Sequence, residues 1–274
     1  VDVAVLEAGM GGRWDATRLA RSEIAGLTTV GTDHRPWLGA TREAIAADKM
    51  HALAAARRAV FGVGVEDELR PILRAGGAVP ASDVLAAAAR PDGRLTAWLG
   101  TTQHTFDAPL PGRHQLDNLH LALALARSAT QQGIIGELEV DRVAGALRAV
   151  HWPGRLSTAR VGGREVLLDG AHNAEGAAAL GRYLAGLPRR FNLVFSCLGD
   201  KPVEEMASHL LPRVGTSAVC RLADDRAMPL ERMLRALPGA IAADSPLEAV
   251  DALPDPLLAT GSLRLVGALL ECAG

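Results

Sequence analysis

The chain has 274 residues and a formal net charge of −2, from 29 Lys and Arg against 31 Asp and Glu. This length suits two domains with separate cores, and a near-neutral charge without a basic block argues against nucleic acid or an anionic membrane as a partner. No apolar run reaches the length of a membrane-spanning helix, and the first 25 residues lack the pattern of a signal peptide. The three cysteines are widely spaced and favour neither a disulfide framework nor a zinc site. We therefore expect a cytoplasmic protein.

The first half of the chain predicts a mixture of strands and helices. Short apolar runs at 2–7 (DVAVLE) and 26–31 (GLTTVG) are each followed by glycine or a loop, which is typical of buried strands. An Ala-rich helix is expected over 41–60, with Thr41 as its N-cap and Glu43 in its first turn. Further predicted elements are a hairpin at 96–108 and helices that begin at His114 and Asp141.

A break in helix propensity occurs at residues 151–156 (HWPGRL), where Pro and Gly separate two compositionally complete halves. We therefore expect a first domain at 1–150, a linker at 151–156 and a second domain at 157–274. Beyond the linker, apolar runs alternate with amphipathic stretches. This alternation predicts an α/β domain with a doubly wound, mostly parallel sheet and with ligand sites at the carboxyl ends of its strands.

Two candidate metal ligands follow the predicted strands of the first domain. Glu7 stands where the first strand opens into the glycine-rich AGMGGRWDAT segment, and a carboxylate there suits a divalent cation beside a phosphate. His34 follows the second strand, in GTDHRPWLG. The simpler alternatives are that GMGG is a tight turn and that His34 is an ordinary surface or core histidine, and both stay open.

Lysine is rare in this chain, since only Lys49 and Lys201 are lysines among the 29 basic residues. Lys49 is on the predicted Ala-rich helix, 15 residues beyond His34. A primary amine can lose its proton and react, for example with carbon dioxide to give a carbamate, whereas a guanidinium stays charged. A carbamate on Lys49 would be a metal-binding anion, and the alternative is one more solvated basic residue.

The loop after a predicted strand of the second domain has residues that suit a nucleotide site. In VLLDGAHNAEG, Asp169, His172 and Asn173 precede a helix, whose backbone amides and positive end attract phosphate. Asp169 could bind a ribose hydroxyl, while His172, and Arg155 from the linker, could approach a phosphate. The plainer interpretations are Asn173 as an N-cap and Arg155 as a surface arginine.

A series of longer motifs follows in order along the chain: VAVLEAGMGGRWDAT, TTVGTDHRPWLGATREAIAADK, LPGRHQLDN, WPGRL, LLDGAHNAEG, LGDKP, DDRAMP and ATGSLRLVG. As a set, they resemble the folylpolyglutamate synthase and dihydrofolate synthase family of the Mur ligase superfamily. Single motifs of this kind are weak, whereas so many in the same order are specific. The resemblance implies the remainder of a Mur-ligase-type P-loop ATPase domain, followed by a Rossmann-like glutamate ligase domain.

The resemblance also implies roles for individual residues. Glu7 and His34 match magnesium ligands, and Lys49 matches a lysine that is carbamylated and helps to place a second metal ion. Positions that match nucleotide-binding residues of the family are Asn118, Arg155, Asp169 and His172. Of all these residues, Lys49 and His172 are the expected catalytic ones. Lys201 matches a lysine to which we assign no role.

The implied reaction is ATP-dependent ligation of L-glutamate to a folate, or also to dihydropteroate, by a monomer. The acceptor's carboxylate attacks the γ-phosphate of ATP, and the amine of glutamate then displaces phosphate from the acyl phosphate. The implied cofactors are ATP, magnesium at two sites and the carbamylated lysine, which together would stabilise charge on the transferring phosphoryl group.

The chain departs from the family at its start and after Lys49. The P-loop that precedes the Glu7 segment in the family has no counterpart, and MHALAAARRAVFG (50–62) replaces the usual sequence after the lysine. We interpret the chain as a truncated ligase that is inactive alone, with an exposed apolar edge at VAVLE. The alternatives are a Mur-like amide ligase with another carboxylate acceptor and a non-catalytic nucleotide-binding protein.

Overall fold

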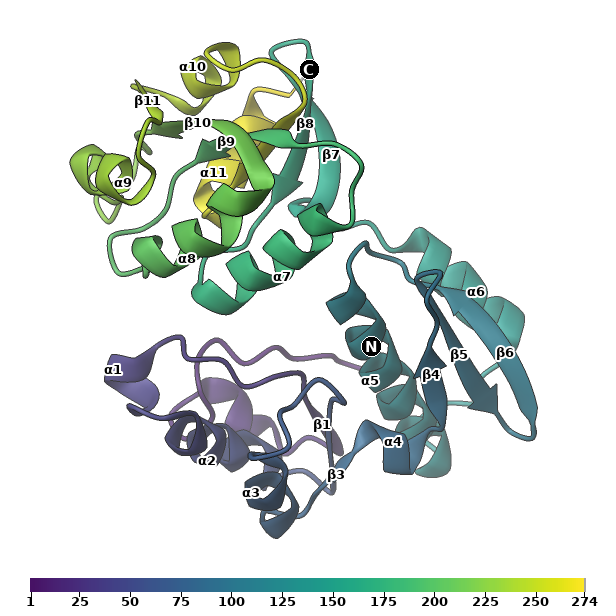
Figure 1. The fold of residues 1–274 in the computed structure, drawn as a ribbon. Coiled ribbons are helices and arrows are strands. Elements are labelled where there is room, and N and C mark those ends of the chain that lie inside the picture. Colours follow the sequence, from purple (N-terminus) through teal and green to yellow (C-terminus); the bar gives the residue numbers. More distant parts are fainter. Residues whose placement is uncertain (274) are drawn as a thin grey trace. The chain divides into compact units, whose positions relative to one another are not determined.

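A computed structural model describes residues 1–273, which form two compact units (Figure 1). Unit 1 contains residues 1–109 and 113–150, and unit 2 contains residues 110–112 and the chain from His151 onward. Each unit has its own buried apolar clusters, so each is described by itself.

Unit 1 is built around a three-stranded parallel sheet in the order β1-β2-β3. The strands are β1 (Ile24–Leu27), β2 (Arg58–Phe61) and β3 (Ala78–Pro80). Side chains alternate across the sheet: Phe61 packs in one cluster with α2 (Arg42–Leu53) and α3 (Arg70–Ala75), whereas Val60 packs in another with α4 (Ala81–Val84) and α5 (Arg113–Gln131). The sheet is therefore covered on both faces, as is usual for parallel strands.

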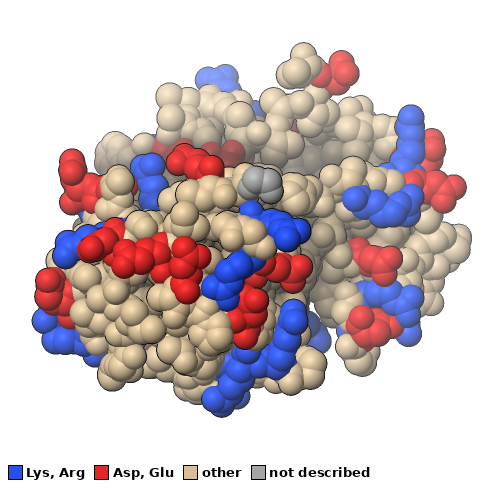
Figure 2. Space-filling view, turned by 90° about the horizontal axis from the view of Figure 1, so that it is seen from above, with Lys and Arg blue, Asp and Glu red and all other residues tan. Residues whose placement is uncertain are grey.

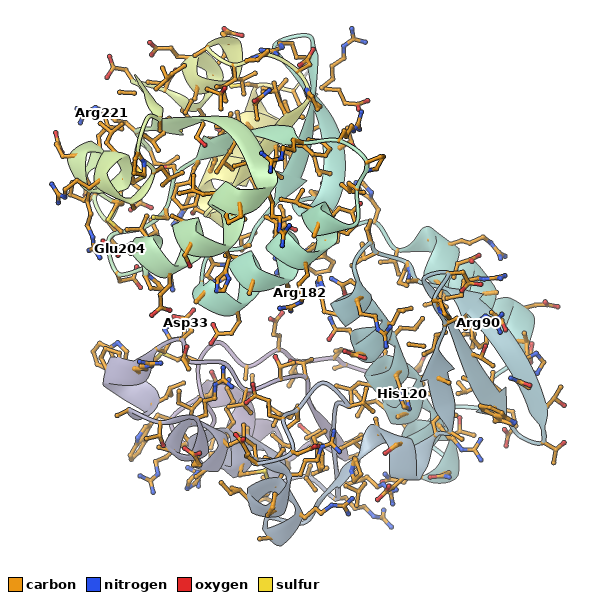
Figure 3. All side chains as sticks on the ribbon, in the orientation of Figure 1. Asp33, Arg90, His120, Arg182, Glu204 and Arg221 are labelled. Atoms are coloured by element: carbon orange, nitrogen blue, oxygen red, sulfur yellow. The ribbon has the colours of Figure 1, made fainter. Side chains whose placement is uncertain are left out.

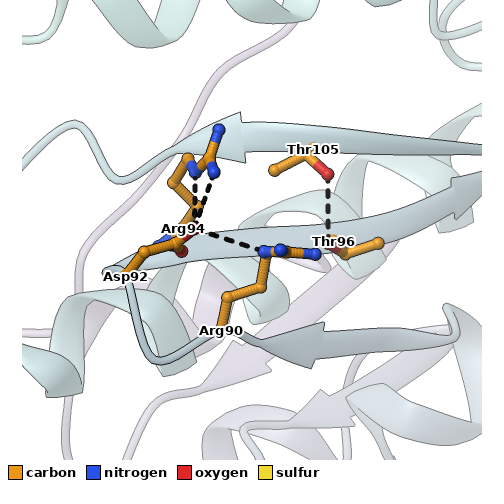
Figure 4. Close-up of polar contacts among 5 residues, drawn as sticks. All are labelled: Arg90, Asp92, Arg94, Thr96 and Thr105. Carbon is orange, nitrogen blue, oxygen red and sulfur yellow. Dashed lines mark hydrogen bonds and ion pairs between the residues drawn. The ribbon is translucent and has the colours of Figure 1, made fainter.

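A second, antiparallel sheet in unit 1 consists of β4 (Ala87–Ala89), β5 (Arg94–Leu99) and β6 (Thr102–Asp107), and α6 (Val140–Ala149) packs against its cluster. The predicted hairpin at 96–108 is confirmed by the β5–β6 pairing. Figure 4 shows the turn before β5, where Asp92 accepts hydrogen bonds from the Arg94 and Arg90 side chains. The Arg94 bonds hold the pKa of Asp92 low, at about 2. Across the strands, the hydroxyls of Thr96 and Thr105 lie 3.1 Å apart.

The predicted helix over 41–60 begins where expected but ends early. Thr41 caps α2, because its hydroxyl accepts a hydrogen bond from the backbone N–H of Ala44 at 3.2 Å. The helix ends at Leu53, and the last residues of the predicted helix form β2 instead. Parallel pairing with β1, in the register Ile24 to Arg58, outweighs the helix propensity of the Ala-rich sequence here. The second predicted strand is found as β1, two residues earlier than expected.

The strand predicted at 2–7 is wrong. These residues have no regular secondary structure, and Val1, Val3, Val5 and Leu6 are exposed. A strand needs a neighbour whose backbone completes its hydrogen-bond ladder, and among residues 1–273 no strand pairs with this segment. The apolar alternation of the sequence therefore produces an exposed apolar segment rather than a buried strand.

Unit 2 has a six-stranded sheet in the order β11-β10-β9-β12-β8-β7. Its strands are β7 (Arg155–Val161), β8 (Arg164–Asp169), β9 (Phe191–Phe195), β10 (Val214–Cys220), β11 (Ile241–Ala243) and β12 (Leu257–Thr260). All neighbours are parallel except β7 and β8. One face packs against α7 (Ala174–Ala185), α8 (Val203–Leu210) and α9 (Leu230–Ala236), and the other against α10 (Pro246–Asp251) and α11 (Leu263–Glu271). The predicted doubly wound, mostly parallel sheet is confirmed, and β7 begins at Arg155, inside the segment expected as a linker.

Short helical turns complete the described chain: η1 (Ala16–Ala20), α1 (Arg35–Leu38) and η2 (Leu211–Arg213). Two polar side chains that Figure 3 labels link elements of the fold. His120 on α5 is buried, with its Nε2 atom 2.8 Å from the carbonyl oxygen of Leu85. Glu204 on α8 accepts two hydrogen bonds from Arg232 on α9, both at 3.1 Å.

Acidic and basic side chains are interspersed over the face of the molecule that Figure 2 shows. This mixture agrees with the formal net charge of −2. Of the helices in residues 1–273, none combines the length and the hydropathy that a membrane span requires.

Candidate active site

Four loops of unit 2 meet at the carboxyl ends of β8, β9, β10 and β12. The loop after β8 joins the loop after β12, because the backbone N–H of Gly261 donates to the carbonyl oxygen of Ala171 at 3.0 Å. The loops after β9 and β10 are joined by the N–H of Gly199, which donates to the carbonyl oxygen of Arg226 at 2.7 Å. The two pairs of loops are connected by an ion pair between Asp224, after β10, and Arg264, after β12, at 3.3 Å. The four loops therefore form one rim at the edge of the sheet where α/β proteins bind ligands.

Asp169, the last residue of β8, forms hydrogen bonds with backbone groups of the rim. Its Oδ1 accepts a hydrogen bond from the N–H of Ala171 at 3.0 Å, and its Oδ2 accepts one from the N–H of Leu156 at 3.2 Å. Burial raises the pKa of this carboxyl, while the two N–H groups and the nearby Arg155 and His172 act in the opposite direction. The carboxylate thus ties the start of β7 to the loop after β8.

Arg155 and His172 both lie beside this carboxylate. A Cβ atom at Gly170 would be 3.2 Å from Nη1 of Arg155, so the guanidinium packs directly on the glycine backbone. The Nδ1 atom of His172 is 2.9 Å from the carbonyl oxygen of Gly170, and this contact requires the proton on Nδ1. Three of the residues proposed from the sequence, Arg155, Asp169 and His172, are therefore brought together.

Asn173 is the N-cap of α7, as its simpler interpretation held. Its side-chain oxygen accepts a hydrogen bond from the N–H of Gly176 at 2.8 Å. The cap fixes the first turn of α7 directly after His172, and it leaves the start of this 12-residue helix beside the rim.

Sequence reasoning missed several rim residues. Ser262 caps α11 and accepts from the N–H of Arg264 at 3.0 Å. Asp224 forms ion pairs with Nε of Arg264 at 3.3 Å and with Nε of Arg226 at 3.6 Å, and the hydrogen bond from the Arg226 N–H lowers its pKa. Their signal was their place directly after apolar runs, in DDRAMP and ATGSLRLVG. Lys201, at 6% exposure, is also in this rim, with its Nζ 3.5 Å from the Asp200 carboxylate.

In unit 1, the glycines of the GMGG segment have a packing role. The backbone N–H of Gly12 donates to Oδ1 of Asp48 on α2 at 2.8 Å. A Cβ atom at Gly12 would be 2.7 Å from the carbonyl oxygens of Asp48 and Lys49, and Gly11 has φ +64. Only glycine allows so close an approach to a helix backbone. The loop that follows Glu7 is thus docked on the turn of α2 that carries Lys49, and Asp48, which sequence reasoning missed, holds it there.

The remaining candidates of unit 1 do not form a closed cluster. Glu7 is exposed, and half-buried Lys49 lies on α2. His34 has φ +60, which is uncommon outside glycine, and its Nε2 lies 3.9 Å from Oδ2 of Asp33. Asn118 on α5 donates to Oε1 of Gln115 at 3.0 Å. Among residues 1–273, no group of three or more His, Cys, Asp and Glu side chains has the arrangement of a metal site.

A cavity in unit 2 lies away from this rim. It has a volume of about 230 Å³, and its lining includes Tyr183, Arg189 and Phe191, with the Arg189 guanidinium 5.0 Å from the centre of the Phe191 ring. Phe191 and Leu257 begin their strands, so this cavity is at the amino end of the sheet. It contains neither Asp169 nor His172.

Comparison with known proteins supports the fold and identifies the family. The family of the Mur ligase glutamate ligase domain matches residues 154–266. Among curated proteins, the dihydrofolate synthase/folylpolyglutamate synthase of Mycobacterium tuberculosis is 35% identical over 85% of this chain and 51% of its own length. A crystal structure of M. tuberculosis folylpolyglutamate synthase complexed with ADP and AMPPCP has a TM-score of 0.79 and 31% identity, covering 98% of this chain and 67% of that one.

The chain belongs to the folylpolyglutamate synthase and dihydrofolate synthase family of Mur ligases. A second M. tuberculosis folylpolyglutamate synthase structure, complexed with ADP, agrees, with a TM-score of 0.83 and 30% identity over 99% of this chain and 68% of that one. This family consists of ATP-dependent ligases. The chain spans about half the length of the first curated relative it matches.

The rim of this folylpolyglutamate synthase family member falls within the matched ligase domain. Arg155, Asp169, His172, Lys201 and Ser262 all lie between residues 154 and 266. The candidates in unit 1 lie outside that range, and the roles of both sets of residues stay predictions.

Proposed function

We propose that the chain takes part in the ATP-dependent addition of L-glutamate to a folate, with dihydropteroate as a further acceptor. The observation that carries this proposal is the grouping of Arg155, Asp169 and His172 on the rim of the glutamate ligase domain. Family membership supports it, and so does the nucleotide in the solved relatives, which are complexed with ADP and AMPPCP.

The proposed reaction has two steps. First, a carboxylate oxygen of the acceptor attacks the γ-phosphorus of ATP, so that an acyl phosphate forms and ADP leaves. Second, the amine of glutamate attacks the acyl carbon, phosphate leaves, an amide forms and the ammonium loses its proton to solvent or to a nearby base. Both steps move negative charge near the transferring phosphoryl group, which cationic side chains stabilise.

The residues of the rim suit these demands. Arg155 presents a permanently charged guanidinium beside Gly170, where it can bind a phosphate. The contact of its Nδ1 atom with the Gly170 carbonyl oxygen holds the His172 ring in place, and from there the ring would approach the nucleotide. Asp169 shapes this arrangement through the N–H groups of Leu156 and Ala171 and stands beside both Arg155 and His172. Asn118 of unit 1 is a further nucleotide contact in this proposal.

Divalent metal would be held by residues of unit 1. Glu7 and His34 offer an oxygen and a nitrogen donor, and a carbamate on Lys49, formed from its amine and carbon dioxide with loss of a proton, would add oxygens for a second ion. The docking of the Gly12 loop on the Lys49 turn fits this set, because it keeps the segment after Glu7 on that helix. Magnesium bound there would neutralise phosphate charge.

The proposal includes the wider assignments made from the sequence. Residues 1–150 are the later part of an ATP-binding domain, residues 151–156 connect it to the ligase domain at 157–274, and the protein acts as a monomer in the cytoplasm. Light scattering coupled to size-exclusion chromatography measures the mass of the protein in solution. The mass of a dimer would contradict the proposal.

The test is incorporation of radiolabelled glutamate into tetrahydrofolate, with and without ATP. It is run on this chain and on the full reading frame of its gene, because the chain spans about half of its first curated relative. Replacing Arg155 or His172 with alanine should abolish incorporation by the active form, whereas Thr158→Ala, an exposed neighbour on β7, should leave it unchanged. No ATP-dependent incorporation by either protein would reject folate glutamylation.

A further inference from the structure

Strand β7 opens with an irregularity. Arg155 pairs with Asp169 and Ser157 pairs with Leu168, so Leu156 has no opposite residue in the register. Leu156 also has φ +52, in the left-handed region that residues with a side chain seldom occupy. An extra residue of this kind is a β-bulge, which bends a strand and redirects the side chains next to it.

Three hydrogen bonds hold this bend. The N–H of Gly154 donates to Oγ of Ser157 at 2.8 Å, which closes the bend on itself. The carbonyl oxygen of Gly154 accepts from the N–H of Gly170 at 2.7 Å, and the N–H of Leu156 donates to Asp169 at 3.2 Å. The bend at 154–157 is thus fixed both internally and to the loop after β8.

Arg155 lies in the middle of this bend. Its neighbours on both sides, Gly154 and Leu156, are hydrogen-bonded to Gly170 and Asp169, so its backbone is held on the loop where its guanidinium packs. A long arginine side chain has many rotamers, and a fixed backbone reduces the number that reach a given point. The direction of Arg155 therefore depends on the bend being closed.

We propose that Ser157 is a positioning residue of the ligase site, whose hydroxyl closes the bend at 154–157 and so directs the Arg155 guanidinium onto the 169–173 loop. The hydroxyl is suited to this role because it is the acceptor for the Gly154 N–H, while the Ser157 backbone belongs to the β7–β8 ladder. The inference rests on the proposed function only where it gives Arg155 a phosphate to bind.

The experiment compares Ser157→Ala with Ser157→Thr, which keeps the hydroxyl, and with Thr158→Ala as the matched control. The readout is the Nε–H resonance of Arg155 in a ¹H–¹⁵N spectrum of the whole chain, assigned from its absence in Arg155→Lys. In Ser157→Ala this resonance should move toward the position of exposed arginines and exchange faster with water. Ser157→Thr should restore it, and Thr158→Ala should leave it in place. An unchanged resonance in Ser157→Ala overturns the proposal.

Binding measurements then separate positioning from general damage. Ser157→Ala should raise the Kd for ATP about three- to tenfold, the range expected for loss of one hydrogen bond, and leave the Kd for adenosine unchanged. Equal weakening of ATP and adenosine would also overturn the positioning role. If the unmodified chain binds no ATP, it is the proposed function of this chain that fails, and the Arg155 resonance still decides the role of Ser157.

Discussion

The side chain of Asp169 and the backbone of Leu156 meet across the β7–β8 pair, where the carboxylate accepts the N–H of Leu156 at 3.2 Å. This N–H has no ladder partner of its own, because Leu156 is the extra residue of the bulge. The bond therefore satisfies a donor that would otherwise be lost, and it fixes the strand next to Arg155. Burial raises the pKa of this same carboxyl group.

The raised pKa of Asp169 predicts how stability changes with pH. The pKa is above the ordinary 3.8, so the folded chain binds this proton more tightly than the unfolded chain. The contribution of Asp169 to the free energy of unfolding is therefore greatest at low pH and falls as the pH rises through 3.8 and the raised value. Asp169→Asn removes this titration, so the stability of the original chain relative to the variant should fall as the pH rises from below 3.8 through the raised pKa of Asp169.

Urea unfolding at a series of pH values measures this difference. Asp141→Asn, which changes an exposed carboxylate on α6, serves as the control and should show no comparable trend. A difference between the chain and Asp169→Asn that grows as the pH rises would contradict the predicted direction.

Gly170→Ala should disturb the site more than the fold. The added Cβ would be 2.4 Å from Cδ2 of Leu263, an exposed side chain that can move, and 3.2 Å from Nη1 of Arg155. We expect a loss of stability of about 1 kcal/mol, together with a displaced Arg155 guanidinium and weaker ATP binding. Gly186→Ala, whose Cβ meets nothing nearer than 3.5 Å, is the control for both measurements. Unchanged ATP affinity in Gly170→Ala would show that the guanidinium does not need this position.

Gly261→Ala should be strongly destabilising, because φ is +111 and the added Cβ would be 2.5 Å from the carbonyl oxygen of Ser196. Neither the backbone of β9 nor that of β12 can move without breaking the central pairing, so we expect a loss of more than about 2 kcal/mol in thermal or urea unfolding. Gly267→Ala is the control with the opposite expected effect. Gly267 lies within α11 with open space where a Cβ would be added, so the substitution should stabilise the chain by up to about 1 kcal/mol. Similar effects of the two substitutions would contradict this account.

The sequence predicted unit 2 better than unit 1 for physical reasons. In unit 2, each strand pairs with other strands of the same unit, so the local apolar pattern and the long-range pairing agree. The loop with Asp169 and His172 lies at the end of such a strand. In unit 1, RAVF at 58–61 has the composition of the helix before it, and only pairing with β1 makes it a strand. The run at 2–7 has strand character but no partner among residues 1–273. Tertiary pairing, which a local pattern does not contain, decided both cases.

The same limit applied to the candidate site. Chemistry identified Arg155, Asp169 and His172, because each stands in a recognisable loop. It did not identify Leu156 or Ser157, whose importance comes from a bulge in strand register, or Asp48, which holds the GMGG loop from 36 residues away. Residues that act through backbone geometry leave little trace in composition or spacing.

Gly12→Ala should release the loop that follows Glu7 from α2. Its Cβ would be 2.7 Å from two carbonyl oxygens and 2.9 Å from the backbone nitrogen of Ala52, none of which can move without distorting the helix. We expect the bond from Gly12 to Asp48 to break and hydrogen exchange at residues 9–14 to accelerate at least about tenfold. Gly9→Ala, in the same loop with its nearest contact at 3.5 Å, should change exchange little. Equal exchange in the two variants would remove the packing role assigned to Gly12.

Unit 2 should fold without unit 1. Both of its apolar clusters consist of residues between Leu156 and Leu270, so none of their buried side chains comes from unit 1. A fragment of residues 151–274 should therefore unfold cooperatively in urea, with the same midpoint that unit 2 shows within the whole chain. A fragment of residues 1–150 should associate with itself, because one of its segments exposes the apolar side chains of Val1, Val3, Val5 and Leu6. Replacing Val3 and Val5 with serine should reduce the light scattering of this fragment. A non-cooperative transition in the 151–274 fragment would mean that the ligase domain depends on contacts that its own clusters do not supply.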